Sequence, residues 1–288
     1  MRLAQAKHSI GNIVREMQAR PHWKRLGQVQ EDPVAAIARA ALATRATQIE
    51  PEEEKAIDKI EEVRARLLTS DTPVTYTDFG ALHPWTELTE EELYKGEERT
   101  RPLAEIAKAS KPPKWALLLF KLARELKPDT VLEMGTCVGI SAAYLLAALQ
   151  LNGKGRLITM EGGKNVAEIA EENLQNLGFT NFEIVTGRHQ DTLPSVLADN
   201  KPIDFAFVDG DHAEHTTITY HEQVLEHTGQ HAVIYHDDIR WSPGMRRCWQ
   251  HICDTDRSVT AILDFHWVGV MVIDKNYRGS PKRFNLFY

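Results

Sequence analysis

Acidic side chains follow two predicted strands, and they are the first residues of this sequence that could support chemistry. Asp209 follows the strand predicted at 204–208, and Asp237 and Asp238 follow the strand predicted at 232–236. Parallel strands present their carboxyl ends at one edge of a sheet, so these three acids are expected to converge. Carboxylates gathered without a cation raise one another's pKa, which makes a hard divalent cation such as Mg²⁺ a natural partner. The alternative role is helix capping, and the two roles are compatible.

Histidine is the second candidate for chemistry. His212 directly follows the acids at the end of the strand predicted at 204–208, and an imidazole titrates near neutral pH, so His212 is a candidate general base. His212 and His215 have an H-x-x-H spacing that can bind zinc, but His215 is more simply a solvated helix residue. Cys137 is more simply a small residue of a ligand-binding loop than a nucleophile, because no histidine can be placed beside it.

A glycine turn connects a predicted strand to a predicted helix. The buried run 130–134 is followed by Gly135 and Gly139 and then by the apolar helix-forming run 141–149. The pattern E-x-G-x-x-x-G lacks the middle glycine of a dinucleotide fingerprint and the lysine of a phosphate-binding loop. A nucleoside that carries an amino-acid tail therefore fits this turn better than a pyrophosphate does.

Glu161 ends the next predicted strand and is followed by two glycines. It lies about twenty residues beyond the glycine turn, the distance at which an acid reaches ribose hydroxyls in such folds. A carboxylate can accept both hydroxyl hydrogen bonds. An ordinary surface glutamate is the alternative, but the position between a buried strand and two glycines favours the ribose role.

A parallel sheet is needed to bring these strand ends together, and the hydrophobic pattern predicts one. Strands alternate with helical patterns, which is typical of a doubly wound α/β fold. We predict a Rossmann-like, mostly parallel sheet of seven strands whose last two form an antiparallel hairpin at one edge. The predicted strands are 130–134, 156–161, 182–186, 204–208, 232–236, 259–264 and 267–273, and the predicted helices between them are 141–150, 164–177, 191–198, 213–227 and 244–253.

Residues 1–110 differ in character from the domain predicted at 111–288. They contain alanine-rich and acidic helical patterns, with an irregular or partly extended connector at 71–86 and a return to helix at 90–109. We expect this N-terminal helical region to pack on the sheet domain or on a second subunit, which would make the protein a homodimer. A lid over the active site is the alternative.

Composition limits the partners. A net charge of −7 without a basic stripe argues against nucleic acid, which needs clustered Lys and Arg. No apolar run is long enough to span a bilayer, and the first residues lack an apolar signal core. Because the three cysteines form no C-x-x-C pair, a reducing cytoplasm is the expected location.

Four segments, LEMGTCVGIS, LITMEGG, TGRHQDTLP and FVDGDH with HDDIRWSPG, carry a family resemblance. From about residue 113 to 250 the chain resembles class I S-adenosylmethionine-dependent methyltransferases, and it looks most like the metal-dependent, catechol O-methyltransferase-like group. The resemblance implies S-adenosylmethionine as cofactor and Mg²⁺ or another divalent cation. It places Glu133, Gly135, Gly139 and Ser141 around the methionine part of the cofactor, Glu161 on the ribose, Gln190 near adenine and Asp209 beside the cofactor, with Asp209, Asp237 and Asp238 as metal ligands.

The resemblance implies an enzyme that methylates a hydroxyl of a small molecule, with Asp209 and His212 as catalytic residues. The sequence departs from the group's pattern at two positions: Asp238 stands where asparagine is usual, and His212 stands where a lysine base is usual. Two alternatives remain open, an N- or C-methyltransferase without catalytic metal and a non-catalytic S-adenosylmethionine-binding module. The tryptophans that could line an aromatic acceptor pocket, or belong to the core, are Trp115, Trp241 and Trp249.

Overall fold

The structure is a computed structural model that describes residues 2–79, 95–210 and 212–288. Parts of the predicted connector at 71–86 and of the predicted helix at 90–109 lie outside these ranges. Within them, no helix combines the length and the apolar character that crossing a membrane requires.

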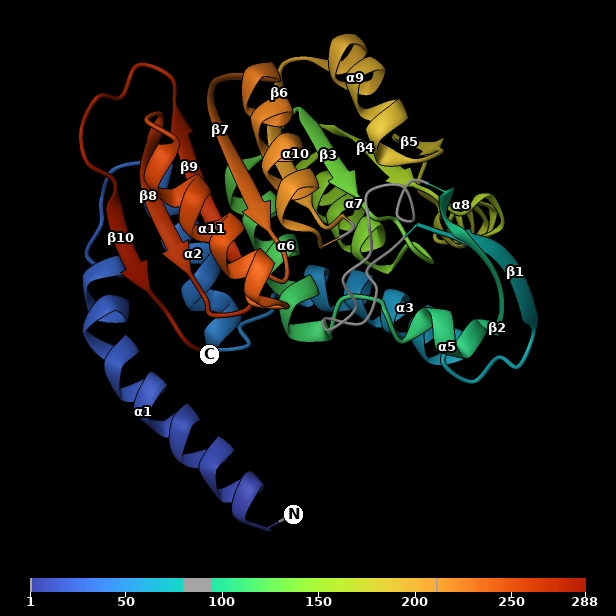
Figure 1. The fold of residues 1–288 in the computed structure, drawn as a ribbon, viewed down its shortest axis with the longest axis horizontal. Helices are drawn as coiled ribbons and strands as arrows, with labels where there is room; N and C mark the ends of the chain where they lie inside the picture. Colours follow the sequence, from blue (N-terminus) through green and yellow to red (C-terminus); the bar gives the residue numbers. More distant parts are fainter. Residues whose placement is uncertain (1, 80–94, 211) are drawn as a thin grey trace.

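A mostly parallel sheet of eight strands forms the centre of the molecule (Figure 1), in the order β10-β8-β9-β7-β6-β3-β4-β5. Only β9 runs antiparallel to its neighbours, β7 and β8. The predicted doubly wound α/β fold is therefore confirmed. The strands are β3 (Thr130–Met134), β4 (Arg156–Glu161), β5 (Phe182–Thr186), β6 (Ile203–Val208), β7 (Thr228–His236), β8 (Val259–Asp264), β9 (Gly269–Asp274) and β10 (Lys282–Asn285).

The seven predicted strands are all present, but the sheet has an eighth. β10 pairs in parallel with β8 and takes the edge, so the antiparallel β8–β9 pair is not the edge hairpin that was predicted. Phe284 is the only buried residue of β10. A four-residue segment with one buried side chain shows too little alternation of apolar and polar residues for a strand to be predicted from the sequence.

Helices cover both faces of the sheet. Alternate residues of β3 enter different clusters: Val131 packs with α6, α7 and α8, whereas Leu132 packs with α9, α10 and α11. This two-sided burial explains why the central strands are continuous apolar runs. The helices are α6 (Pro113–Leu126), α7 (Ile140–Asn152), α8 (Lys164–Asn176), α9 (His189–Asn200), α10 (Glu214–His227) and α11 (Pro243–Thr255).

The N-terminal region packs against the sheet domain. Its helices are α1 (Arg2–Leu26), α2 (Val34–Arg45), α3 (Pro51–Leu67) and α5 (Leu103–Ala107). α2 contacts α6, α3 contacts α7, and α1 contacts β10. The fully buried Leu26, Ile37 and Ile60 belong to the same apolar cluster as α6 and α7, so the two regions share one core.

The N-terminal region also contains an antiparallel pair of strands that the sequence did not predict. β1 (Pro73–Asp78) pairs with β2 (Glu97–Pro102), which lies where a helix was expected. The helix prediction for this stretch is wrong because cross-strand contacts override the helix preference of its Glu and Arg residues. Thr75 and Thr100 share a hydrogen bond of 2.7 Å, and Asp78 and Arg99 form an ion pair of 3.3 Å.

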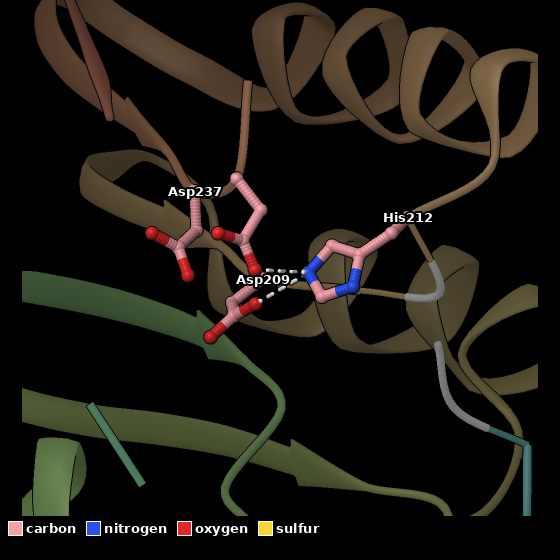
Figure 2. Close-up of side chains that lie close together, drawn as sticks. Asp209, His212 and Asp237 are labelled. Atoms are coloured by element: carbon pink, nitrogen blue, oxygen red, sulfur yellow. Dashed lines mark hydrogen bonds and ion pairs between the residues drawn. The ribbon is translucent and has the colours of Figure 1, made fainter. Parts of the chain in front are cut away.

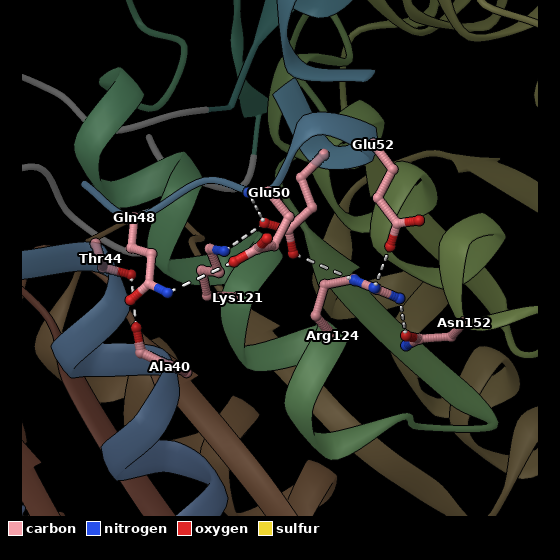
Figure 3. Close-up of polar contacts among 9 residues, drawn as sticks. Ala40, Thr44, Gln48, Glu50, Glu52, Lys121, Arg124 and Asn152 are labelled. Atoms are coloured by element: carbon pink, nitrogen blue, oxygen red, sulfur yellow. Dashed lines mark hydrogen bonds and ion pairs between the residues drawn. The ribbon is translucent and has the colours of Figure 1, made fainter. Parts of the chain in front are cut away.

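Charged groups fix the start of α3 against α6 (Figure 3). Glu53 accepts the backbone N–H of Glu50 and forms a buried ion pair with Lys121. Arg124 adds contacts of 3.0 Å to Glu52 and 2.6 Å to Asn152. These contacts join α3, α6 and the end of α7.

Replacement of Glu53 tests this connection. The Glu53→Ala variant leaves the Lys121 ammonium buried without its partner, so we expect the free energy of unfolding to fall by roughly 3–5 kcal/mol. Urea unfolding measures it. The exposed neighbour provides the control, since Glu54→Ala should change stability by less than about 0.5 kcal/mol. Equal effects of the two variants would contradict the inferred role of Glu53.

Candidate active site

The acids predicted to converge do so at the carboxyl edge of the sheet. β6 and β7 are neighbours in register, with Val208 opposite His236, so Asp209 and Asp237 emerge side by side. One ligand atom from each of Asp209, His212, Asp237 and Asp238 lies within 4.8 Å of the others. We call these four residues the acid cluster. Figure 2 shows His212 reaching from its loop toward Asp209.

His212 is held between two carboxylates. Its Nε2 lies 3.0 Å from Asp209 Oδ1 and 3.4 Å from Asp238 Oδ2. His215, the other residue of the H-x-x-H spacing, is not part of the acid cluster. His212 and Asp238 both have positive φ, of 53° and 48°, which is uncommon for residues other than glycine.

A buried lysine that the sequence did not reveal enters the acid cluster. Lys111 lies between α5 and α6, and its Nζ is 3.2 Å from Asp209 Oδ2 and in contact with Asp237 Oδ2. Its side chain is 9% exposed, and the ammonium stands 5.8 Å from the centre of the Phe207 ring. No local motif marks this residue, because only tertiary packing brings the start of α6 to the ends of β6 and β7.

The charges of the acid cluster shift its pKa values in different directions. Burial raises the pKa of Asp209, but Lys111 and His212 together lower it by more than burial raises it. The pKa of Asp209 is therefore lowered to about 2. Burial also raises the pKa of Asp238, and there Lys111 and His212 only partly oppose the rise. Burial alone would lower the pKa of His212, yet Asp209 and Asp238 bring it above its ordinary value. Asp209 is thus a firmly ionised group at neutral pH.

The donor set of the acid cluster fits a divalent cation. It offers carboxylate oxygens, the ligands that Mg²⁺ prefers, together with one imidazole nitrogen. Lys111 already touches two of the three carboxylates, so an ion that used the same oxygens would have to displace the ammonium.

The glycine turn lies against the acid cluster. Gly135 has φ of 92°, and a Cβ there would collide with the backbone oxygen of Asp209. Gly139 has φ of 87° and approaches the backbone of Ala170 in α8, where a Cβ would lie 3.3 Å from it. Cys137 lies between them, and burial raises the pKa of its thiol to about 12. A thiol that stays protonated is a poor nucleophile, in agreement with its predicted role as a small loop residue.

Two further predicted residues support this turn from neighbouring strands. Glu161 accepts hydrogen bonds from the backbone N–H groups of Cys137, at 2.7 Å, and Gly163, at 2.9 Å. Glu133 is fully buried and accepts a 2.6 Å hydrogen bond from Thr159. Burial raises the pKa of Glu133 to about 7, and Asp209 and Glu161 add to the rise, while Ser141 and Thr159 oppose it.

A cavity of about 130 Å³ connects Glu161, Gln190 and Asp209. Gln190 lies in the first turn of α9 and lines the same cavity as Glu161. Glu133, Gly139 and Ser141 do not line this cavity; Glu133 and Ser141 are buried under the turn. Four further lining residues come from the β1 strand and its end, which the sequence did not point to: Tyr76, Thr77, Asp78 and Phe79.

The β1 segment covers the end of the cavity that lies at the loop after β4. Phe79 lies over Gly162, where a Cβ would meet its ring at 2.7 Å, and Tyr76 lies beside Gly163. Asn165 of α8 donates a 2.5 Å hydrogen bond to the carbonyl of Thr75. A segment of the N-terminal region therefore closes over Glu161.

The three candidate tryptophans occupy different places. Trp115 packs on Phe265 and Tyr288, and Trp249 is buried with a hydrogen bond to Asp264, so both belong to the core. Trp241 is 36% exposed and stacks obliquely on His212, with ring centres 5.7 Å apart. Trp241 is therefore the one of the three that borders the acid cluster.

Two solved structures named as methyltransferases align with most of this chain. The O-methyltransferase from Bacillus cereus in complex with SAH aligns with a TM-score of 0.55 at 19% identity, covering 83% of this chain and 97% of that one. The SAH-bound methyltransferase of Podospora anserina aligns with a TM-score of 0.56 at 13% identity, covering 87% and 100%. At these identities the likeness establishes the fold.

The sequence comparisons define the family of the domain. A family model described as a methyltransferase domain matches residues 132–239. The catechol O-methyltransferase of Niastella koreensis is 34% identical over 36% of this chain and 47% of its own length, and that of Mycobacterium tuberculosis is 31% identical over 47% and 60%. The chain thus spans about half the length of these relatives. Residues 132–239 are therefore similar to a methyltransferase domain, and the chain is similar to catechol O-methyltransferases, which confirms the resemblance predicted from the sequence.

The raised pKa of Glu133 predicts a pH-dependent stability. Between pH 4.5, the ordinary pKa, and about 7, the folded state keeps a proton that the unfolded state has lost, so stability falls as pH rises. Glu133→Gln removes this loss. We expect the stability of the variant relative to the wild type to grow by about 3 kcal/mol between about pH 4.5 and 8, measured by urea unfolding.

The exposed Glu183 of β5 provides a matched control, because Glu183→Gln should show no such pH dependence. A pH-independent difference between Glu133→Gln and the wild type would show that Glu133 titrates alike in the folded and unfolded states.

Proposed function

We propose that this protein transfers the methyl group of S-adenosylmethionine to a hydroxyl oxygen of a small molecule, assisted by a divalent cation. The observation that carries the proposal is the acid cluster at the carboxyl edge of the sheet, in backbone contact with the glycine turn at Gly135. The proposed cation site would then lie next to the proposed cofactor site, as methyl transfer between two bound groups requires.

The cofactor-binding residues proposed from the sequence surround this turn. Glu161 would bind the ribose hydroxyls with the lone pairs that its two backbone contacts leave free. Gln190 would contact adenine from α9. Bound S-adenosylmethionine would supply an activated methyl group on its sulfonium. The residues proposed for its methionine part and the adjoining wall are Glu133, Gly135, Gly139, Ser141 and Asp209.

The acid cluster would hold the cation and receive the proton. Asp209, Asp237 and Asp238 are the proposed ligands, and a bound Mg²⁺ would lower the pKa of the acceptor hydroxyl. His212 would accept the hydroxyl proton, since Asp209 and Asp238 stabilise its imidazolium form. Trp241 borders His212 and offers an aromatic surface to the acceptor.

A second candidate is an N- or C-methyltransferase without catalytic metal. Lys111 favours it, because its ammonium already compensates Asp209 and Asp237. A non-catalytic S-adenosylmethionine-binding module is the third. The three candidates differ in their response to chelation and in turnover.

Metal removal separates these candidates. The acceptor is first found by screening hydroxyl compounds with labelled S-adenosylmethionine. We expect methyl transfer to this acceptor to stop in EDTA and to return with Mg²⁺. Cofactor binding, measured by calorimetry, should persist, because most of its proposed contacts lie on β3, β4 and α9. Asp237→Ala should behave like chelation, with activity reduced at least about 100-fold.

Asp199→Ala, an exposed acid on α9, is the matched control and should keep full activity. Full activity in EDTA would support the metal-free candidate and leave His212 as the proposed base. Cofactor binding without turnover on any hydroxyl, amine or carbon acceptor would support the binding module.

We propose that the N-terminal region, residues 1–110, acts as a lid on the domain at 111–288. The β1 segment supports this role, since Tyr76 and Phe79 cover Gly162 and Gly163. The cavity of about 130 Å³ is smaller than the roughly 300 Å³ at which ligand sites begin. Cofactor entry would therefore displace Phe79, which would then pack against the bound nucleoside.

Replacement of Phe79 tests the lid. Phe79→Ala should weaken S-adenosylmethionine binding about tenfold and speed its dissociation, because an apolar cover is lost.

Glu161→Ala should weaken binding by roughly 1.5–3 kcal/mol through loss of a charged acceptor. Calorimetry and stopped-flow fluorescence measure both. Tyr277→Ala, in the β9–β10 connection, is the control, and unchanged binding by Phe79→Ala would exclude contact with the cofactor.

The remaining expectations concern partners and location. The proposed homodimer would cover Ile13, Val14 and Met17, which are exposed on α1. The three cysteines are free thiols, which supports the proposed cytoplasmic location. A small-molecule acceptor, with neither nucleic acid nor membrane as partner, remains part of the proposal.

A further inference from the structure

The position of Lys111 has a consequence for how the acid cluster binds cations. The ammonium contacts Asp209 Oδ2 and Asp237 Oδ2 at once, and its side chain is 9% exposed. Asp237 is 2% exposed, so water contributes little to compensating its charge. The lysine is thus a counter-ion of both Asp209 and Asp237.

We propose that Lys111 is a built-in cation that keeps the acid cluster assembled without metal and competes with a divalent cation for Asp209 and Asp237. The inference rests on the proposed function in one respect, which is that the acid cluster is the site that takes the divalent ion.

Competition follows from the shared oxygens. A divalent ion bound to Asp209 and Asp237 would stand a few ångströms from an ammonium that contacts the same carboxylates, and like charges at that distance repel strongly in a buried site. The ammonium must leave before the ion can bind. A lysine can do so, because its charge is a single point on a flexible four-carbon stem.

Lys111 does not contact every carboxylate of the acid cluster. Lys111 contacts Asp209 and Asp237, whereas Asp238 faces His212 at 3.4 Å. Asp238 therefore provides a carboxylate that the lysine does not occupy. An incoming ion can bind there first and then displace the ammonium from the other two acids, so that Lys111 sets the cation concentration at which the site fills.

The test compares Mg²⁺ affinities of the full-length protein and its variants by calorimetry. Lys111→Met keeps the length of the side chain and removes the charge, so we expect it to bind Mg²⁺ at least tenfold more tightly than the wild type. Lys111→Arg keeps the charge and should bind no more tightly than the wild type. Lys114→Met, three residues away and packed on Tyr288, is the matched control and should leave the affinity unchanged.

Thermal unfolding provides a second readout. In EDTA, Lys111→Met should melt at a lower temperature than the wild type, because its acids have lost their counter-ion. Added Mg²⁺ should raise the melting temperature of the variant and so remove the difference. The wild type should change little with EDTA. A Lys111→Met protein that remains unfolded in both conditions would overturn the idea that a divalent ion can take the place of the ammonium.

Two results of the affinity measurement would also overturn the proposal: equal or weaker Mg²⁺ binding by Lys111→Met, or equally tightened binding by Lys111→Arg. These results are distinct from failure of the proposed function. Methyl transfer that persists in EDTA would remove the metal from the reaction but would leave tighter Mg²⁺ binding by Lys111→Met as support for the competition. If activity stops in EDTA but the wild type and Lys111→Met bind Mg²⁺ with equal affinity, the proposed function is kept and the role of Lys111 is rejected.

Discussion

Compensation of buried negative charge at the ends of β6 and β7 is the constraint on which the rest of the site depends. Asp209 and Asp237 emerge side by side because β6 and β7 are parallel neighbours, and neither can be ionised there without a nearby cation. Lys111 supplies that cation from the loop before α6. The position of this loop, and with it the junction of the N-terminal region and the sheet domain, is therefore tied to the charge of the strand ends.

The same edge couples the two candidate ligand sites. A side chain at Gly135 would collide with the backbone of Asp209, so the turn after β3 and the loop after β6 are in direct contact. Glu161 fixes the other side of that turn by accepting the N–H of Cys137. A shift of Asp209 would therefore be transmitted to the turn, which gives a physical reason to expect cation and cofactor binding to influence each other.

Local pattern predicted the sheet and the convergence of Asp209, Asp237 and Asp238, because buried parallel strands are continuous apolar runs and their carboxyl ends meet at one edge. Lys111, Tyr76 and Phe79 could not be predicted in this way. Their positions depend on how α6 and β1 pack against distant strands, and nothing in the neighbouring sequence records that packing. β2 was misassigned for a related reason, since its pairing with β1 outweighs the helix preference of Glu97, Glu98 and Arg99.

The N-terminal region and the segment that joins it to the sheet domain therefore contribute to the proposed chemistry at two points. β1 brings Phe79 over the cavity at Glu161, and the segment that leads into α6 brings Lys111 to the acid cluster. Both segments are anchored by a core shared with α6 and α7, to which Leu26, Ile37 and Ile60 belong. The sheet can position the acids and the glycine turn by itself, but the cover of the cavity at Glu161 comes from the N-terminal region, and the counter-ion of the acids comes from the segment that joins this region to the sheet. Under the proposed function, differences in these two segments would change cofactor access and cation affinity while the sheet stayed the same.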